Sequence, residues 1–268
     1  KILAYNTNNI HSKFILNLNG FKQHFIEWEG HDPPLILIHP KRSNVYHWIH
    51  FIECLNISNR LIALDLRGHG LSEYTKNGYS VPNLGKDILS FMKQMKIYEA
   101  IFVGCATGGN LCIWLASKYR EKVKAIGVLD PGLSVPKQIA DEVLRQTFQE
   151  HNFPSFEMAK KSMHFQDLWS EEVKEYYAKK SFKKREDGRW EWLYAPQAAR
   201  NIANSLNNDS VWDLSKQVFC PTLILRGIHS PVFTEEHIKK LSLNISHARI
   251  VNLENSSHTP AQENPSGL

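Results

Sequence analysis

Short apolar runs of strand length recur along the chain, separated by stretches in which the apolar residues follow helical spacing. The runs are 35–38, 61–64, 101–103, 126–129, 222–225 and 250–253, and the clearest helical stretches are 81–95 and 110–119. An uninterrupted apolar run of this length is typical of a strand buried on both faces of a parallel sheet. Strands that alternate with crossover helices predict a right-handed, doubly wound α/β fold.

The start of the chain has a different pattern. Residues 14–18 and 21–28 are strand-like, and Asn19-Gly20 lies between them. Asn-Gly readily adopts the positive φ angles of a tight two-residue turn. We therefore expect a β-hairpin, closed by a two-residue turn, ahead of the parallel strands.

A long interruption separates the strand at 126–129 from the strand at 222–225. Between Pro131 and Pro221 no clear buried strand occurs, and helix-like segments rich in charge take its place. We predict a core formed by residues 1–132 and 218–268, with a helical cap inserted at 133–217. The aromatic residues of the cap either pack on one another, as apolar residues at helical spacing usually do, or line a pocket. They are Phe148, Phe156, Phe165, Trp169, Tyr176, Tyr177, Trp190, Trp192 and Tyr194.

The charge pattern bears on the expected partner. The chain has 32 Lys and Arg against 27 Asp and Glu, a formal net charge of +5. The basic residues occur only in short runs such as Lys183-Lys184-Arg185, without the interleaved aromatic residues of a nucleic-acid surface. We expect solvated helix faces and no nucleic-acid partner, which leaves a small molecule as the expected ligand or substrate.

Cysteine usage and hydropathy narrow the class further. The four cysteines form no Cys-x-x-Cys pair and have no neighbouring histidine at metal-ligand spacing, so we expect neither a metal nor another cofactor. No apolar stretch has the length of a membrane span, and the first residues lack the apolar centre of a signal peptide. These features indicate a soluble, cytoplasmic protein without a membrane partner, and the sequence carries no signature of its oligomeric state.

Four segments carry recognisable chemistry or turn geometry: LILIHPKRSN (35–44), LDLRGHGLSE (64–73), FVGCATGGNLCIWLA (102–116) and NLENSSHTPAQENP (252–265). In this order they resemble the α/β-hydrolase superfamily, and the resemblance covers nearly the whole chain. It implies the α/β-hydrolase fold, a mostly parallel doubly wound sheet with an inserted helical cap.

The third segment resembles the nucleophile elbow, usually Gly-x-Ser-x-Gly, in which a strand turns sharply into a helix. The glycines of the turn are present, but the middle position is Ala106. A methyl group cannot attack a carbonyl carbon, so the covalent intermediate of the family cannot form at this position. Cys105 is expected to point away from the site and to serve packing. The backbone N–H of Thr107, which follows the nucleophile position, is the expected oxyanion donor.

The fourth segment places His258 just after the last strand, where the resemblance implies the general base. The acid usually follows the strand at 222–225 as Gly-x-x-Asp, but this chain has Ser230 there. Asp130, at the end of the strand at 126–129, resembles the acid of one branch of haloalkane dehalogenases, whereas other relatives carry Asp-Pro at this place without using it. We predict a hydrogen bond between an Asp130 oxygen and a His258 ring nitrogen, because a carboxylate orients a histidine base far better than a hydroxyl does.

The first two segments resemble loops around the site. The first resembles the loop that supplies an oxyanion N–H, usually His-Gly, but His39 is followed here by a proline, which has no N–H. Lys41 or Arg42 could supply the donor, and their cationic side chains either face an acidic ligand group or are exposed. His39 either contributes to ligand binding or anchors the loop. In the second segment we expect Asp65 and Arg67 to hold the loop by a charge-assisted hydrogen bond.

The resemblance to esterases, lactonases and dehalogenases leaves two explanations of Ala106. In the first, a serine was replaced by alanine, and the parent hydrolyses small apolar esters, thioesters or lactones. In the second, Ala106 is natural, and the fold serves as a ligand-binding or sensor protein, or as a cofactor-free enzyme with His258 as base. The intact elbow glycines and His258 favour the first, whereas the loss of His-Gly and of the usual acid favours the second.

Overall fold

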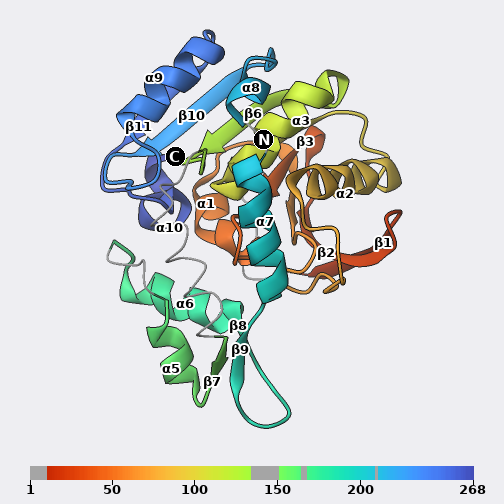
Figure 1. Cartoon of the computed structure of the whole chain (residues 1–268), viewed down its shortest axis with the longest axis vertical. Coiled ribbons are helices and arrows are strands. Elements are labelled where there is room, and N and C mark those ends of the chain that lie inside the picture. Colours follow the sequence, from red (N-terminus) through yellow and green to blue (C-terminus); the bar gives the residue numbers. More distant parts are fainter. Residues whose placement is uncertain (1–10, 134–150, 164–167, 209–210) are drawn as a thin grey trace.

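An eight-stranded sheet forms the centre of the computed structural model, which describes residues 11–133, 151–163, 168–208 and 211–268 (Figure 1). The strand order is β1-β2-β4-β3-β5-β6-β10-β11, with antiparallel pairing of β1 with β2 and of β2 with β4, and parallel pairing elsewhere. The strands are β1 (Ser12–Asn17), β2 (Phe21–Trp28), β3 (His31–Ile38), β4 (Asn59–Leu64), β5 (Ala100–Cys105), β6 (Val123–Leu129), β10 (Thr222–Gly227) and β11 (Arg249–Leu253). Each of the eight strands predicted from the sequence is present.

Helices cover both faces of the sheet, so the doubly wound fold is confirmed. On β3, Ile36 and Ile38 pack in the cluster that contains α2 and α3, whereas Leu35 and Leu37 pack in the cluster of η1 and α1. Successive side chains of a strand point to opposite faces, so an apolar run fills two cores at once. The helices of the core are α1 (Ile49–Cys54), α2 (Val81–Gln94), α3 (Thr107–Lys118), α8 (Val211–Ser215), α9 (Glu235–Asn244) and α10 (Pro260–Glu263), with 3₁₀ turns η1 (Val45–Trp48), η2 (Arg120–Lys122) and η3 (Pro265–Gly267).

The hairpin forms, but its turn differs from the prediction. Asn17 pairs with Phe21, so three residues rather than two close the loop. Gly20 has φ +83°, whereas Asn19 is outside the left-handed region. A two-residue type I′ turn needs positive φ at both positions. Instead the Asn19 side chain donates to Asp87 on α2 (2.7 Å), which fixes the loop against the core.

The inserted segment contains the predicted helices and, in addition, a small sheet that the sequence did not predict. It contains α5 (Phe156–Lys161), α6 (Glu171–Ser181) and α7 (Pro196–Asn208), together with a small antiparallel sheet of β7 (Asn152–Phe153), β9 (Trp190–Trp192) and β8 (Phe182–Lys184). The helix α8 also falls within the predicted range, but its Val211 packs in the main core. Strands of two or three residues are too short to show alternation in a sequence. In Figure 1, α5, α6 and the small sheet lie together at one end of the molecule, whereas α7 runs beside the core. The cap boundaries remain a prediction, because 134–150, 164–167 and 209–210 are outside the described residues.

The aromatic residues of this segment largely pack on one another. Trp169 contacts Tyr177, and Phe182 contacts Trp192, with ring centroids 5.1 Å and 4.0 Å apart. Phe156 and Trp190 pack against the same cluster. Phe148 and Phe165 are outside the described residues. Self-packing of the cap, one of the two readings of its aromatic residues, accounts for these contacts.

The first turn of α3 lies in close contact with the ends of the two central strands. A Cβ added to Gly108 would lie 2.0 Å from the carbonyl oxygen of Ile38, and one added to Gly104 would lie 2.2 Å from the backbone of Gly108. No side chain fits in either gap. The glycines of the third sequence segment therefore allow the helix to begin directly above the sheet.

Replacement of Gly108 by alanine should destabilise the fold by about 1–3 kcal/mol, because the added methyl group would overlap backbone atoms that cannot easily move. Gly109→Ala is the matched control in the same turn, since its nearest atom would lie 3.1 Å away on the Val128 side chain. Both variants gain the same helix propensity. Urea denaturation of the two variants measures the difference, and equal stability would contradict the steric account.

Candidate active site

The turn between β5 and α3 holds Ala106 in a strained backbone conformation. Its φ and ψ are 48° and −112°, a region that residues with a Cβ rarely adopt. Hydrogen bonds fix the turn: the N–H of Ala106 donates to the carbonyl of Leu129 on β6 (2.9 Å), and the N–H of Asn110 donates to the carbonyl of Ala106 (3.1 Å). Thr107 begins the helix, where the first N–H groups have no intrahelical acceptor. Its N–H is thus placed where an oxyanion donor is expected.

The side chain at the elbow cannot act as a nucleophile. Ala106 presents only a methyl group, and the neighbouring Cys105 is fully buried, with Sγ 3.8 Å from the backbone oxygen of His258. Burial raises the pKa of the Cys105 thiol well above its ordinary value, and Asp130 and Glu263 add to the shift. A thiolate is therefore strongly disfavoured, in agreement with a packing role for Cys105.

The hydrogen bond predicted between His258 and Asp130 is present. His258 Nδ1 lies 2.6 Å from Asp130 Oδ2, although 128 residues separate the two in sequence. Asp130 follows β6 directly and is fully buried, and His258 lies in the loop between β11 and α10. Because the carboxyl ends of parallel strands meet at one edge of a sheet, both residues reach the edge where Ala106 lies. Their catalytic roles stay a prediction.

Further hydrogen bonds hold the Asp130 carboxylate. Ser230 Oγ donates to Asp130 Oδ2 (2.6 Å), and the N–H of Gly227 donates to Oδ1 (3.3 Å). The backbone of Asp130 is at φ 42°, which aspartate tolerates better than most residues. Ser230, the alternative acid position, therefore contacts the carboxylate as a supporting donor and does not replace it.

Glu263 on α10 holds the backbone on both sides of His258, a role that sequence reasoning missed. One oxygen of the carboxylate accepts the N–H of Ser257 (2.6 Å) and of Thr259 (3.3 Å), and the other accepts the Thr259 hydroxyl (3.0 Å). Trp169 of the cap donates to the same hydroxyl (2.9 Å). The Glu-Asn-Pro after His258 belongs to the fourth sequence segment and helped to indicate the family, but it did not indicate a role for the glutamate.

The ring of His39 anchors its loop, which is one of the two roles expected of it, and its contacts give no support to the other role, ligand binding. The N–H of Leu66 donates to Nε2 (3.0 Å), and Nδ1 is 2.7 Å from the carbonyl oxygen of Pro40. Since Nε2 accepts, Nδ1 must carry the proton and donate. Burial lowers the pKa of His39 to about 3, so the ring is neutral at pH 7. The side chain is fully buried, and both nitrogens are in use.

Asp65 and Arg67 have different partners from those expected. Arg67 makes a two-bond pair with Asp87 on α2, at 2.6 and 2.8 Å. Asp65 instead accepts from His24 (2.6 Å) and from the N–H groups of Val45 and Leu71. Each carboxylate thus holds one side of the loop. The position of Asp87 on the buried face of α2 was the signal that could have identified it as the partner of Arg67.

Lys41 and Arg42 lie in the short turn after β3, and both side chains are half-buried. Burial and the nearby Arg42 charge lower the pKa of Lys41 to about 8. Arg42 hydrogen-bonds the buried Tyr194, whose pKa burial raises to about 12. The next residue, Ser43, hydrogen-bonds the hydroxyl of Tyr177 on α6, so the loop also contacts the cap.

His47 links the loop to the helix after His258. Gln262 on α10 donates to the carbonyl of His47 (2.7 Å) and lies 2.8 Å from His47 Nδ1. Burial lowers the pKa of His47 to about 3, and the nearby His258 adds to the shift. His47 is therefore neutral and joins η1 to α10 beside the site.

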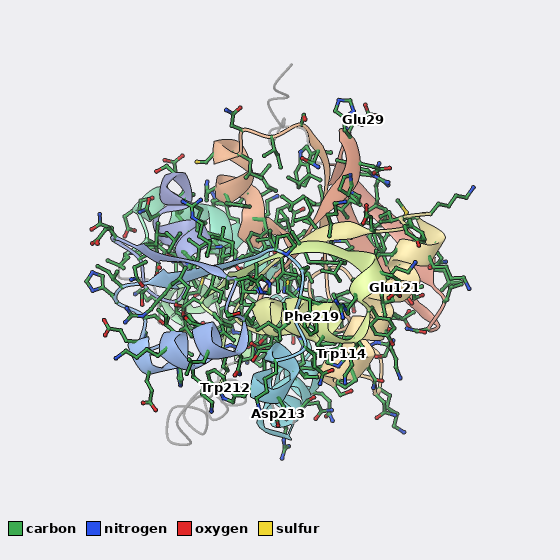
Figure 2. All side chains as sticks on the ribbon, turned by 90° about the horizontal axis from the view of Figure 1, so that it is seen from above. Glu29, Trp114, Glu121, Trp212, Asp213 and Phe219 are labelled. Atoms are coloured by element: carbon green, nitrogen blue, oxygen red, sulfur yellow. The ribbon has the colours of Figure 1, made fainter. Side chains whose placement is uncertain are left out.

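The described residues show no cluster of His, Cys, Asp or Glu side chains suited to a metal ion. None of the described helices is long and apolar enough to span a membrane. A hollow of about 240 Å³ lies at the opposite, amino end of the central strands, lined in part by Glu99, Arg120, Lys124 and Phe219. Figure 2 labels Phe219, which is part of this lining. This hollow is separate from the site around Ala106.

Comparison with known proteins identifies the family. Residues 33–265 match the α/β-hydrolase-fold family, and the chain belongs to it. The esterase Rv0045c of Mycobacterium tuberculosis is 24% identical over 91% of this chain and 82% of its own length. The 3-oxoadipate enol-lactonase 2 of Acinetobacter baylyi is 23% identical over 87% of this chain and 84% of its own length. The crystal structure of E-2-(acetamidomethylene)succinate hydrolase superimposes with a TM-score of 0.87, at 20% identity over 96% of this chain and 95% of its own. By sequence the chain is related to esterases, enol-lactonases and epoxide hydrolases.

Glu263→Gln should lower the free energy of unfolding by about 1.5–3 kcal/mol, because hydrogen bonds from Ser257 and Thr259 would lose a charged acceptor. Faster amide hydrogen exchange at Ser257 and Thr259 should accompany the loss. The control is Glu254→Gln, an exposed glutamate of the preceding turn. Unchanged exchange at both amides would show that Glu263 does not hold the loop.

The fold should lose stability below about pH 6.5. In the folded chain the pKa of His39 and His47 is about 3 and that of His69 about 4, against a reference value of 6.5. The unfolded chain binds more protons between these limits, so stability is full above pH 6.5 and falls toward pH 4. Each histidine should contribute about 1–2 kcal/mol of loss at pH 5. Urea titrations from pH 7.5 to 4.5 measure the slope, and His47→Gln should reduce it.

Proposed function

We propose that this chain carries the site of a hydrolase of small esters, thioesters or lactones from which the nucleophile is missing, so that it binds such compounds without turning them over. The hydrogen bond between His258 and Asp130, 2.6 Å long, is the observation that supports this proposal. A buried carboxylate that accepts a hydrogen bond from a histidine is the arrangement that a histidine base requires. Base, acid, strained elbow and helix N–H are all retained around Ala106.

In an active relative with serine at this position, His258 would take the hydroxyl proton as the oxygen attacks the carbonyl carbon. Asp130 would stabilise the resulting imidazolium, and the N–H of Thr107 would stabilise the oxyanion. With Ala106 the attack has no nucleophile. The remaining groups can still bind and polarise a carbonyl compound.

A second candidate is cofactor-free proton abstraction by His258. The same pair supports it, because a base oriented by a carboxylate can remove a proton from carbon without a nucleophile at residue 106. The ligand-binding and proton-abstracting readings differ in one measurable respect. Only the latter predicts His258-dependent exchange of a substrate C–H with deuterated solvent in the unaltered chain.

The names of two relatives bear on the class of substrate. The enol-lactonase and the succinate hydrolase are both named for compounds that carry carboxylate groups. The expected ligand is therefore a small acyl compound, and the relatives favour one with an acidic group.

The chain as written should hydrolyse p-nitrophenyl acetate and butyrate at near-background rates, because loss of the nucleophile of a catalytic triad costs on the order of 10⁶ in kcat in a well-studied protease. Ala106→Ser should restore turnover, since the elbow and the His258–Asp130 pair are in place. The double variant Ala106→Ser/His258→Ala should return to background. Ordinary enzyme rates from the unaltered chain, lost on His258→Ala, would refute the proposal.

A further inference from the structure

The loop that follows β3 carries two neighbouring cations and contacts both the first turn of α3 and the cap. Ile38, the last residue of β3, pairs with Gly104 of β5, and its carbonyl oxygen lies in contact with the first turn of α3. Lys41 and Arg42 follow within the next turn of the chain. On the other side, Ser43 hydrogen-bonds Tyr177, and the side chain of Asn44 donates to the carbonyl of Lys180 (2.8 Å). The loop therefore borders the space between Ala106 and the cap.

The charge of Lys41 is not compensated among the described residues. No described residue accepts a hydrogen bond from its ammonium group, although the side chain is half-buried, and the charge that acts on its pKa is the like charge of Arg42. A partly buried cation without a carboxylate costs free energy, and a second cation beside it adds to the cost. Exposed loop lysines avoid this cost by extending into water. The arrangement is stabilised when an anion enters.

We propose that Lys41 and Arg42 form a carboxylate subsite, which binds the anionic end of an acyl compound whose ester, thioester or lactone carbonyl lies at Ala106. The inference rests on the proposed function and gives its ligand a second functional group. An ammonium and a guanidinium on adjacent residues can donate to both oxygens of one carboxylate. Tyr194, which is buried, hydrogen-bonds Arg42 and so restrains the position of the guanidinium.

Isothermal titration calorimetry of the full chain with two probes of equal length tests the subsite. At pH 7 and fixed ionic strength, monomethyl adipate, which carries one carboxylate, should bind at least about tenfold more tightly than neutral dimethyl adipate, because charged hydrogen bonds contribute that much or more. Lys41→Met and Arg42→Met should each weaken the half-ester by about tenfold and leave the diester unchanged. The matched control is Lys124→Met, an exposed lysine at the amino end of β6 with an ion pair to Glu99 (3.5 Å).

A pH series gives a second readout. Affinity for the half-ester should fall as the pH rises from 7 to 9.5, because Lys41, whose pKa is about 8, loses its proton. His39, His69 and Tyr194 on the packed elements do not titrate in this range, since their pKa values are about 3, about 4 and about 12. Lys41→Arg should retain binding and remove the dependence, because arginine stays charged. Any dependence shared with the diester comes from other groups.

The outcomes separate the two proposals. Equal affinity for half-ester and diester, or half-ester binding that survives both Lys41→Met and Arg42→Met, overturns the subsite and leaves the proposed function standing. Failure of both probes to bind overturns the subsite together with the proposed function. Melting temperatures of the variants verify the fold, and Lys41→Met should be at least as stable as the unaltered chain because it removes an uncompensated charge.

Discussion

The contact between the first turn of α3 and the ends of β3 and β5 is the constraint on which the site depends. Gly104 and Gly108 let two backbones meet at a distance that excludes any side chain. The chain must therefore reverse direction within one residue, and that residue, Ala106, takes a strained backbone conformation. The contact fixes where the helix begins and so where its free N–H groups point. The strain persists although the residue itself has no chemistry to offer.

The remaining polar groups reach this point because of the parallel sheet. Asp130 directly follows β6, and His258 lies in the loop after β11. Each strand independently places its residue at the carboxyl edge of the sheet, where the two side chains are in contact. Single side chains then fix the loops that follow the strands. Glu263 holds the His258 loop, and Ser230 holds the carboxylate of Asp130. The order of the strands thus determines which residues reach the site, and a few hydrogen bonds determine how their side chains are oriented.

The sequence predicted most of the core and the central pair of the site. Short apolar runs identify the buried strands, and the carboxyl ends of parallel strands meet at one edge of the sheet. The contact between Asp130 and His258 could therefore be predicted, although the two residues are far apart in the sequence. Side-chain contacts that depend on tertiary packing could not be predicted from the sequence. Arg67 has several acidic residues in range, and only the approach of α2 selects Asp87. The short strands around Trp192 were not predicted, because three residues are too few to show the alternation of a strand. The role of His39 could not be predicted either, because it depends on the backbone groups that its ring contacts in the folded chain.

The methyl group of Ala106 also changes the kinetics of any complex at this site. In a serine hydrolase the acyl group is attached to the protein for part of each cycle, and the lifetime of that state is set by hydrolysis. Here no covalent bond to residue 106 can form, so a ligand that reaches the elbow can leave it by dissociation unchanged. Trp169 of the cap is hydrogen-bonded to the His258 loop, so the cap lies against this part of the site. Under the proposed function, occupancy of the site would follow the concentration of the ligand, as it does in a receptor.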